Sequence, residues 1–165
     1  MSDDRHQRSY DYEARRFDPA VALSVSGLDY LRGVLRGDYP AAPIAATLGF
    51  TPVEFDHGRA VFEGTPERFV YNPIGAVHGG WAATLLDSAM GCAVHTTLPA
   101  GKAYTTVDLS ISMVRAITER VGRVRCEAKI IHAGSSIATA EGRIVGADGT
   151  LYAHGTSTCL VLTPR

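Results

Sequence analysis

The segment 81–98 constrains the fold most, because as a helix it is apolar around nearly its whole circumference. It follows a glycine-rich loop and closes at Pro99-Ala100-Gly101. Its apolar residues are Trp81, Ala82, Ala83, Leu85, Leu86, Ala89, Met90, Cys92, Ala93 and Val94. A helix with no polar face is buried, so the sequence predicts a central helix that other elements must cover.

Six alternating runs around this helix are typical of β-strands. They span residues 50–55, 59–63, 104–114, 122–132, 136–145 and 150–162. Turn sequences separate neighbouring runs at Asp56-His57-Gly58, Ala133-Gly134 and Asp148-Gly149. The predicted fold class is therefore α+β, a curved antiparallel sheet of about five to six strands wrapped around one central helix. Such a half-shell leaves an edge strand open, which favours dimerisation.

The residues before the sheet have a different character. Residues 1–19 mix charges with Ser and Tyr without periodicity, which predicts a frayed arm. A helical spacing follows in Leu28, Leu31, Val34 and Leu35. Gly37, Pro40 and Pro43 then predict the end of this helix and a turn-rich connector. We expect an N-terminal arm with a lead-in helix over residues 1–48 and a globular domain over residues 49–165.

Composition excludes several classes of protein. The 165 residues carry 16 Lys and Arg against 17 Asp and Glu, a balance that argues against a nucleic-acid partner. No apolar run is long enough for a membrane span, and the N-terminus has no apolar core of a secretory signal. The three cysteines lie far apart without a CxxC motif. These features predict a cytoplasmic protein with no membrane partner.

Two consecutive glycines follow His78 where the central helix is expected to begin. Because each glycine weakens a helix by roughly 1 kcal/mol, another requirement must favour this pair. Without side chains, Gly79 and Gly80 expose backbone N–H donors at the positive end of the helix dipole, where an oxyanion is stabilised. The alternative is that they only form a tight turn into the helix.

Asp87 is the only charged residue between Arg68 and Lys102, inside the most apolar segment. A carboxylate buried without compensation is costly, so it needs a partner or a function. One interpretation is local capping with Thr84 or Ser88. The other is a catalytic base or nucleophile.

The spacing of these two groups has a consequence for assembly. Gly79 and Asp87 are eight residues apart on one helix, so their backbones are separated by roughly 12 Å. Groups acting on one carbonyl must converge to within about 3.5 Å. One helix cannot meet this condition, whereas two helices packed antiparallel can. If the two groups are catalytic, the enzyme is an obligate dimer with sites at its interface.

Several polar residues near these positions have two interpretations each. Asn72 can bind a ligand carbonyl or fix a turn, and His78 can orient substrate or bond to local backbone. Thr105 and Thr106 can hold a water molecule or reflect β-propensity. Arg115 can bind an anion or be solvated. The histidines show no metal-ligand spacing, so we predict no metal.

These residues occur in an order that resembles a known family. The order is a glycine-rich loop, a helix acid, a strand threonine and two hairpin turns: Asn72-x-x-Gly75-x-x-His78-Gly79-Gly80, Leu85-Leu86-Asp87, Thr106-Val107-Asp108-Leu109, Gly134 and Asp148-Gly149. Over residues 27–162 the chain resembles the hotdog-fold thioesterases of the phenylacetate-pathway (PaaI-like) type.

The resemblance implies hydrolysis of an acyl- or aryl-CoA thioester to a free acid and CoA, with no cofactor beyond the CoA of the substrate. It implies that Asp87 acts as general base or nucleophile and that the Gly79 amide of the other subunit polarises the thioester carbonyl. Thr106 would position the attacking water, and Asn72 and His78 would shape that end of the site. The implied assembly is a homodimer, and we expect a dimer of dimers.

We expect further substrate contacts from Gly80, Trp81, Met113, Arg115, Gly134, Ser135 and Ser136. Trp81 and Met113 suit either an apolar acyl pocket or the core. Many relatives carry a cation directly after the glycine at position 134, where this chain has two serines. They also often have Arg-Pro where this chain has Arg115-Ala116. Arg115 is therefore the better candidate for a CoA phosphate.

Two other functions are compatible with this fold. Hotdog hydratases and dehydratases act on acyl-CoA, but they carry their histidine in a different loop pattern, which this chain lacks. A non-catalytic acyl-CoA sensor is the second alternative. Sensors usually add a DNA-binding module, and residues 1–49 are too short and too mixed in charge for a basic helix-turn-helix.

Overall fold

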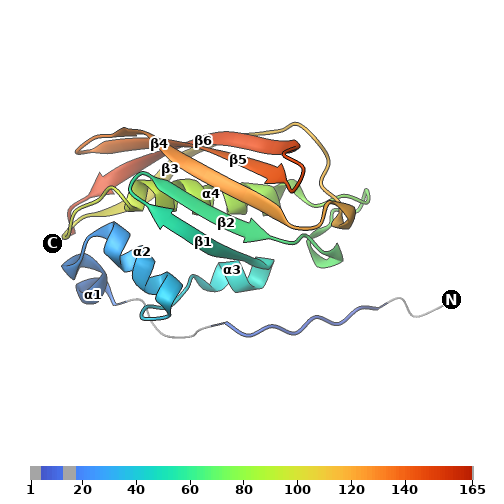
Figure 1. Ribbon diagram of the computed structural model, residues 1–165, viewed down its shortest axis with the longest axis horizontal. Coiled ribbons are helices and arrows are strands. Elements are labelled where there is room, and N and C mark those ends of the chain that lie inside the picture. Colours follow the sequence, from blue (N-terminus) through green and yellow to red (C-terminus); the bar gives the residue numbers. More distant parts are fainter. Residues whose placement is uncertain (1–4, 13–17, 165) are drawn as a thin grey trace.

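The computed structural model describes residues 5–12 and 18–164. A six-stranded antiparallel sheet wraps around one long helix, α4 (Gly79–His95), and three short helices lie on the other side of α4 (Figure 1). The strands are β1 (Phe50–Asp56), β2 (Arg59–Gly64), β3 (Ala103–Met113), β4 (Val124–Ala133), β5 (Ile137–Gly146) and β6 (Leu151–Leu162). All six predicted strands are confirmed within two residues, as is the fold class.

The ends of α4 differ from the prediction of 81–98. The helix begins two residues earlier, because the His78 side chain accepts a hydrogen bond from the Gly80 N–H at 2.9 Å and caps its first turn. It ends at His95, three residues before Leu98. Its body is the core of the molecule, with Leu85, Leu86, Ala89 and Met90 fully buried. The predicted central helix is therefore confirmed, and its boundaries were wrong.

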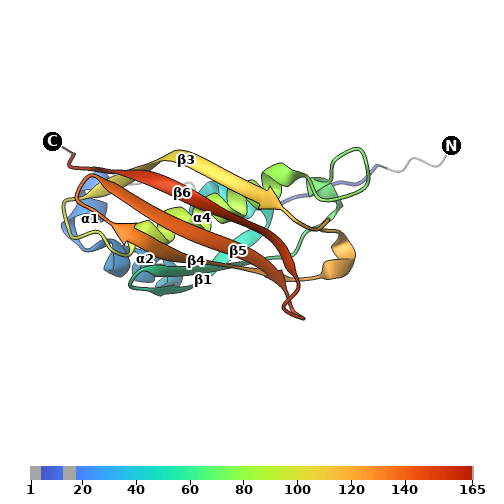
Figure 2. The same cartoon turned by 90° about the horizontal axis from the view of Figure 1, so that it is seen from above.

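The sheet order is β1-β2-β4-β5-β6-β3, which leaves β3 at an edge (Figure 2). The ladder between β3 and β6 contains an irregularity between Thr106 and Asp108, which leaves Val107 unpaired and 57% exposed. A bulge of this kind re-aims neighbouring side chains. Thr106 points to α4 as a result of its place in this ladder, opposite the buried Cys159.

Three helices precede the sheet, of which the sequence predicted one. Helix α2 (Gly27–Arg36) confirms the lead-in helix. Helices α1 (Pro19–Ser24) and α3 (Pro43–Leu48) were not predicted, and the expectation of a turn-rich connector was wrong over the residues of α3. Each has Pro at its first turn, a position where the missing N–H of proline costs nothing.

The predicted frayed arm lies partly outside the described residues, at 1–4 and 13–17. In the described part, Arg8 donates to the carbonyl oxygens of Thr47 and Ala46 at 2.8 and 3.0 Å. Its guanidinium also lies 3.8 Å from the ring centre of Phe69. These contacts hold the arm around Arg8 against the end of α3, so this part is not frayed.

Helix α2 packs closely on the C-terminal half of α4. The Gly27 N–H donates to the Leu98 carbonyl at 3.0 Å, and a Cβ on Gly27 would overlap the His95 carbonyl oxygen. Only a glycine permits this approach. No helix in the described residues is long and apolar enough to cross a membrane.

Candidate active site

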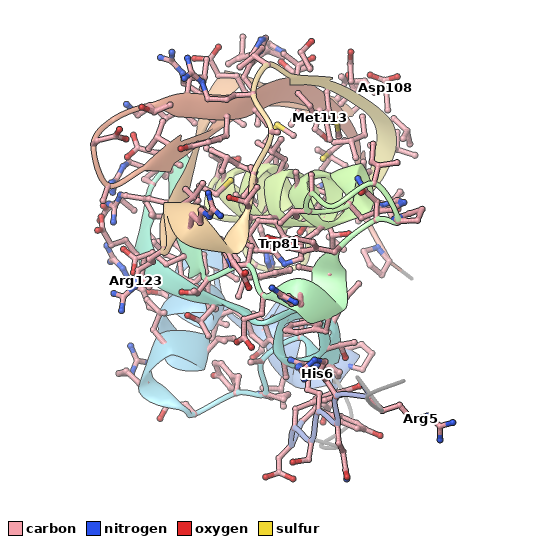
Figure 3. All side chains as sticks on the ribbon, turned by 90° about the vertical axis from the view of Figure 1, so that its right-hand side faces the viewer. Arg5, His6, Trp81, Asp108, Met113 and Arg123 are labelled. Atoms are coloured by element: carbon pink, nitrogen blue, oxygen red, sulfur yellow. The ribbon has the colours of Figure 1, made fainter. Side chains whose placement is uncertain are left out.

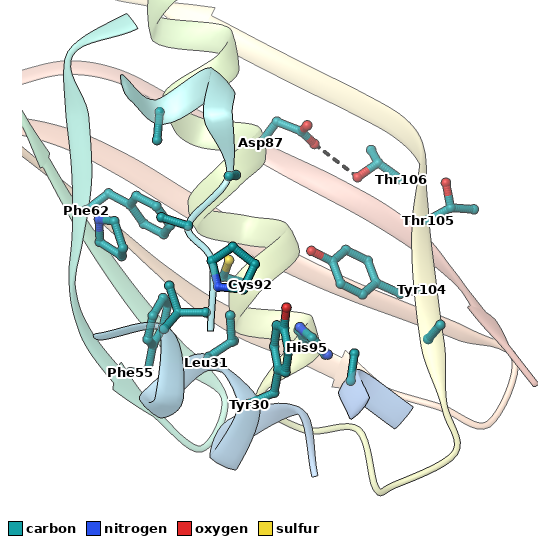
Figure 4. A pocket seen from close by; sticks show the side chains of 18 of the residues that line it. Tyr30, Leu31, Phe55, Phe62, Asp87, Cys92, His95, Tyr104, Thr105 and Thr106 are labelled. Atoms are coloured by element: carbon teal, nitrogen blue, oxygen red, sulfur yellow. Dashed lines mark hydrogen bonds between the residues drawn. The ribbon is translucent and has the colours of Figure 1, made fainter. Parts of the chain in front are cut away.

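The Asp87 carboxylate lies on the side of α4 that faces β3. The Thr106 hydroxyl donates a hydrogen bond to Asp87 Oδ1 at 3.0 Å (Figure 4). Thr84 instead bonds to the Gly80 carbonyl, so the local capping interpretation with Thr84 does not hold. Asp87 Oδ2 has no hydrogen-bond partner in the described part of the chain. One oxygen is therefore held in place while the other is available to a ligand.

Asp87 and Thr106 line an apolar cavity of about 800 Å³. Cys92, His95 and Tyr104 also line it, and burial shifts the pKa of each toward its neutral form. Burial raises the pKa of the Cys92 thiol to about 12 and lowers the pKa of His95 to about 4. Burial likewise raises the pKa of Tyr104 well above its usual value. At neutral pH the three groups are uncharged, which leaves Asp87 and Lys102 as the charged lining residues of the cavity.

The loop before α4 is held by its own side chains. Asn72 Oδ1 accepts hydrogen bonds from the N–H groups of Ile74 and Ala76 at 3.0 and 3.3 Å. The His78 side chain caps α4 through Nδ1. The backbone N–H of His78 donates to the Val70 carbonyl. Both residues therefore fix the loop locally, which agrees with the turn-forming interpretation of Asn72 and the backbone-bonding interpretation of His78.

Gly79 is the first residue of α4, and its N–H finds no acceptor among the described residues. It lines a second cavity, of about 340 Å³, together with Asn72, His78, Met113 and Arg115. A free N–H at the positive end of a helix favours a partial negative charge, such as a polarised carbonyl oxygen. This cavity thus brings together five of the residues that the sequence singled out.

Among the residues that the structure describes, none lines both cavities. Asp87 and Thr106 belong to the first and Gly79 to the second, separated along α4 by roughly 12 Å of helix rise. One copy of the chain therefore does not bring the carboxylate and the free N–H to a common point. This separation is the one expected from the sequence spacing.

Trp81 and Gly80 lie away from both cavities. Trp81 is 3% exposed, and its indole N–H donates to the Leu48 carbonyl at 2.8 Å. Figure 3 places Trp81 and Met113 on opposite sides of α4. Both Trp81 and Gly80 line a third cavity, of about 620 Å³, next to Phe69. Trp81 therefore acts as a core residue that ties α3 to α4, whereas Met113 packs near Gly79.

The residues expected to contact CoA phosphates lie at two ends of the sheet. Gly134, Ser135 and Ser136 form the hairpin between β4 and β5, and the Ser136 carbonyl accepts from the Val161 N–H. This hairpin is at the Thr106 end of the sheet, since Ala138, Cys159 and Thr106 are neighbours across the ladders. Arg115 follows the opposite end of β3 and is exposed. One chain does not bring these groups together.

Sequence reasoning missed most of the wall around Asp87. Tyr30, His95 and Tyr104 line the same cavity, yet no short motif marks them. The one indication in the sequence was the helical spacing that includes Leu31 and Val34. This spacing predicted that one face of the helix is buried, but it did not indicate which elements that face packs against. No three His, Cys, Asp or Glu side chains in the described residues form a group suited to a metal ion.

The fold and the site define a class of protein, a hotdog-type domain with an acid on its central helix. Residues 74–153 match the Thioesterase superfamily. A protein of Halobacterium salinarum, provisionally named an esterase, is 38% identical over 84 residues. That match covers 50% of this chain and 54% of the relative, so the chain spans about half the length of the curated relative.

Solved structures agree with this assignment. A phenylacetic acid degradation-related protein from Ralstonia eutropha is 29% identical, with a TM-score of 0.72, covering 79% of this chain and 98% of its own. The PaaI protein of the E. coli phenylacetic acid degradation operon is 21% identical, with a TM-score of 0.71, covering 84% and 96%. The second likeness concerns the fold alone. Residues 74–153 thus carry the likeness to the Thioesterase superfamily, and the chain has the hotdog fold.

Proposed function

We propose that this protein is an acyl-CoA thioesterase that hydrolyses an acyl- or aryl-CoA to a free acid and CoA. One observation carries the proposal: a carboxylate, Asp87, held by Thr106 at the wall of an apolar cavity. The cavity suits an apolar acyl group. The likeness of residues 74–153 to the Thioesterase superfamily supports the reaction class.

The reaction needs an oxygen nucleophile at the thioester carbon. Asp87 either accepts a proton from an attacking water or attacks through its free oxygen and is released by water afterwards. In both routes a C–O bond forms, the C–S bond breaks and the departing CoA thiolate takes up a proton. The products are the carboxylic acid and the CoA thiol. Thr106 holds the orientation of the carboxylate during these steps.

The oxyanion that develops on the thioester oxygen needs a donor, which we assign to the Gly79 N–H of a second subunit. Strand β3 supports such a dimer, because it is an edge strand whose Leu109 and Met113 are 37% and 53% exposed. A long edge strand with unpaired backbone groups tends to pair with another strand. Antiparallel pairing of two β3 strands sets the start of one α4 beside the Asp87 turn of its partner. Each dimer then has two equivalent sites.

The test is release of free thiol from a panel of acyl-CoA thioesters, with Asp87→Asn as the matched variant. Asn keeps the shape of the side chain and accepts from Thr106, but it neither takes up a proton nor forms an acyl anhydride. We expect turnover by the wild type and a loss of at least about 10³-fold in kcat for the variant. Circular dichroism and gel filtration check that fold and assembly are unchanged.

Two results would overturn the proposal. The first is a wild type that releases no thiol from any thioester. The second is an Asp87→Asn variant with wild-type turnover. Hydration of an enoyl-CoA without thiol release would instead favour the hydratase alternative, and tight binding without either reaction would favour the sensor.

A further inference from the structure

Helix α2 forms part of the cavity in which Asp87 lies. Tyr30, Leu31 and Val34 line this cavity from α2. Figure 4 shows Tyr30 and Leu31 across the cavity from Asp87 and Thr106. The Leu31 side chain is 6% exposed, so packing against its neighbours holds it in place. The cavity is therefore not a property of the sheet and central helix alone. The N-terminal region supplies its far wall.

A chain of aromatic rings closes the cavity at this wall. Tyr39 stacks on Tyr30 at 4.7 Å between ring centres, Tyr30 lies 5.9 Å from the His95 ring, and His95 lies 5.4 Å from Tyr104. The four rings link the segment after α2 through α4 to β3. Contacts at these distances stabilise one arrangement of the rings. The wall is consequently fixed before a ligand enters.

His95, against whose ring Tyr30 of α2 packs, lies at a definite distance from the reacting group. Asp87 and His95 both line the cavity and are eight residues apart on α4, which corresponds to roughly 12 Å. Between them the lining is apolar, and the charged lining residues are Asp87 and Lys102. The Lys102 ammonium is held by Thr163 at 2.7 Å. A small acyl group would leave most of this space without contacts.

We propose that α2 is the specificity element of the enzyme, and that Leu31 and Val34 set the length of the apolar acyl group that is accepted. The preferred substrate carries a medium-length acyl chain, whose end contacts α2 while its carbonyl lies at Asp87. This inference rests on the proposed thioesterase function. It assigns to the N-terminal region a role in substrate selection.

The test compares kcat/KM for octanoyl-CoA and butyryl-CoA in the wild type and three variants. Val34→Phe adds volume to the α2 wall of the cavity, and we expect the octanoyl-to-butyryl ratio to fall by about tenfold or more. Leu35→Phe is the matched control, because Leu35 is on the same helix, is 40% exposed and does not line the cavity. We expect its ratio to equal that of the wild type. Leu31→Ala lengthens the cavity and raises the ratio of dodecanoyl-CoA to octanoyl-CoA.

The two proposals fail in different ways. A wild type that hydrolyses thioesters, with unchanged ratios in Val34→Phe and Leu31→Ala, overturns the role of α2 and leaves the thioesterase function intact. If no thioester is hydrolysed, calorimetric Kd values for octanoyl-CoA and butyryl-CoA on Asp87→Asn decide the role of α2. Val34→Phe then weakens octanoyl-CoA selectively, and an equal effect on both ligands contradicts the inference.

Discussion

The backbone N–H of Gly79 makes no hydrogen bond within α4, and the side chain of Met113 lies next to its Cα. A Cβ at this position would lie 3.0 Å from Met113 Cε, the end of a flexible side chain. A substitution is therefore tolerated by a small shift of Met113. The fold therefore does not require a glycine at this position. The features that bear on the proposed oxyanion site are the free N–H and the space in front of it.

This allows the donor to be removed without removing the helix. Proline is favoured at the first helical position, and His78 has φ −63° and ψ 134°, which a following proline accepts. We expect Gly79→Pro to lower kcat by about 10² to 10³-fold, as for other single oxyanion donors. Gly79→Ala adds the same Cβ but keeps the N–H, so it retains most of the activity. Equal kcat values for the two variants would remove Gly79 from the oxyanion site.

At the scale of elements, the sequence predicted the sheet and both long helices because each is set by local pattern. The apolar circumference of α4 and the alternation of the strands are properties of neighbouring residues. The helix α3 and the docking of Arg8 depend on distant contacts instead, such as the Trp81 bond to Leu48. No local pattern contains that information.

The candidate site divides in the same way. Asp87 and Gly79 were found because each is unusual in its own segment. The hydrogen-bond partner of Asp87 was harder to predict from the sequence. Thr106 lies close enough to Asp87 because of the register of β3 against β6 and the adjacent bulge. The wall supplied by α2 was missed because the cavity lining comes from elements that meet only in the folded chain, namely α1, α2, α3, α4, β1, β2 and β3.

The junction of α2, α4 and β3 contains His95, whose titration reports on this packing. Burial lowers its pKa in the folded chain to about 4, against about 6.5 when unfolded. The unfolded state therefore binds more protons between these values, so the free energy of unfolding decreases as pH falls from 6.5 to 4. We expect His95 to account for about 3 kcal/mol of this decrease.

Urea unfolding at several pH values measures the effect. His95→Gln does not titrate, so the free energy of unfolding of the wild type should fall by about 3 kcal/mol relative to that of the variant from pH 7 to pH 4. The pairs that Arg59 and Arg125 make with carboxylates on the outer face titrate equally in both proteins and cancel. A difference that stays constant with pH would mean that His95 is not buried by the packing of α2.

For the whole molecule, the two separate cavities of one chain lead us to propose that activity is a property of a dimer. A purified heterodimer of Asp87→Asn and Gly79→Pro chains, isolated with two different tags, has one site with both groups intact. It should regain about half the wild-type kcat per dimer, although each homodimer is inactive. A site contained in one subunit would give an inactive heterodimer instead.

A second, reciprocal heterodimer distinguishes shared sites from sites inside one subunit even if a single variant keeps some activity. One chain carries both Asp87→Asn and Gly79→Pro, and its partner is wild type. With sites shared between subunits, each site receives one defective group, and the heterodimer is inactive. With sites inside subunits, the wild-type chain keeps its site and half the activity remains. Because the two hypotheses predict opposite results in both heterodimers, a general loss of stability in the variants cannot imitate the shared site.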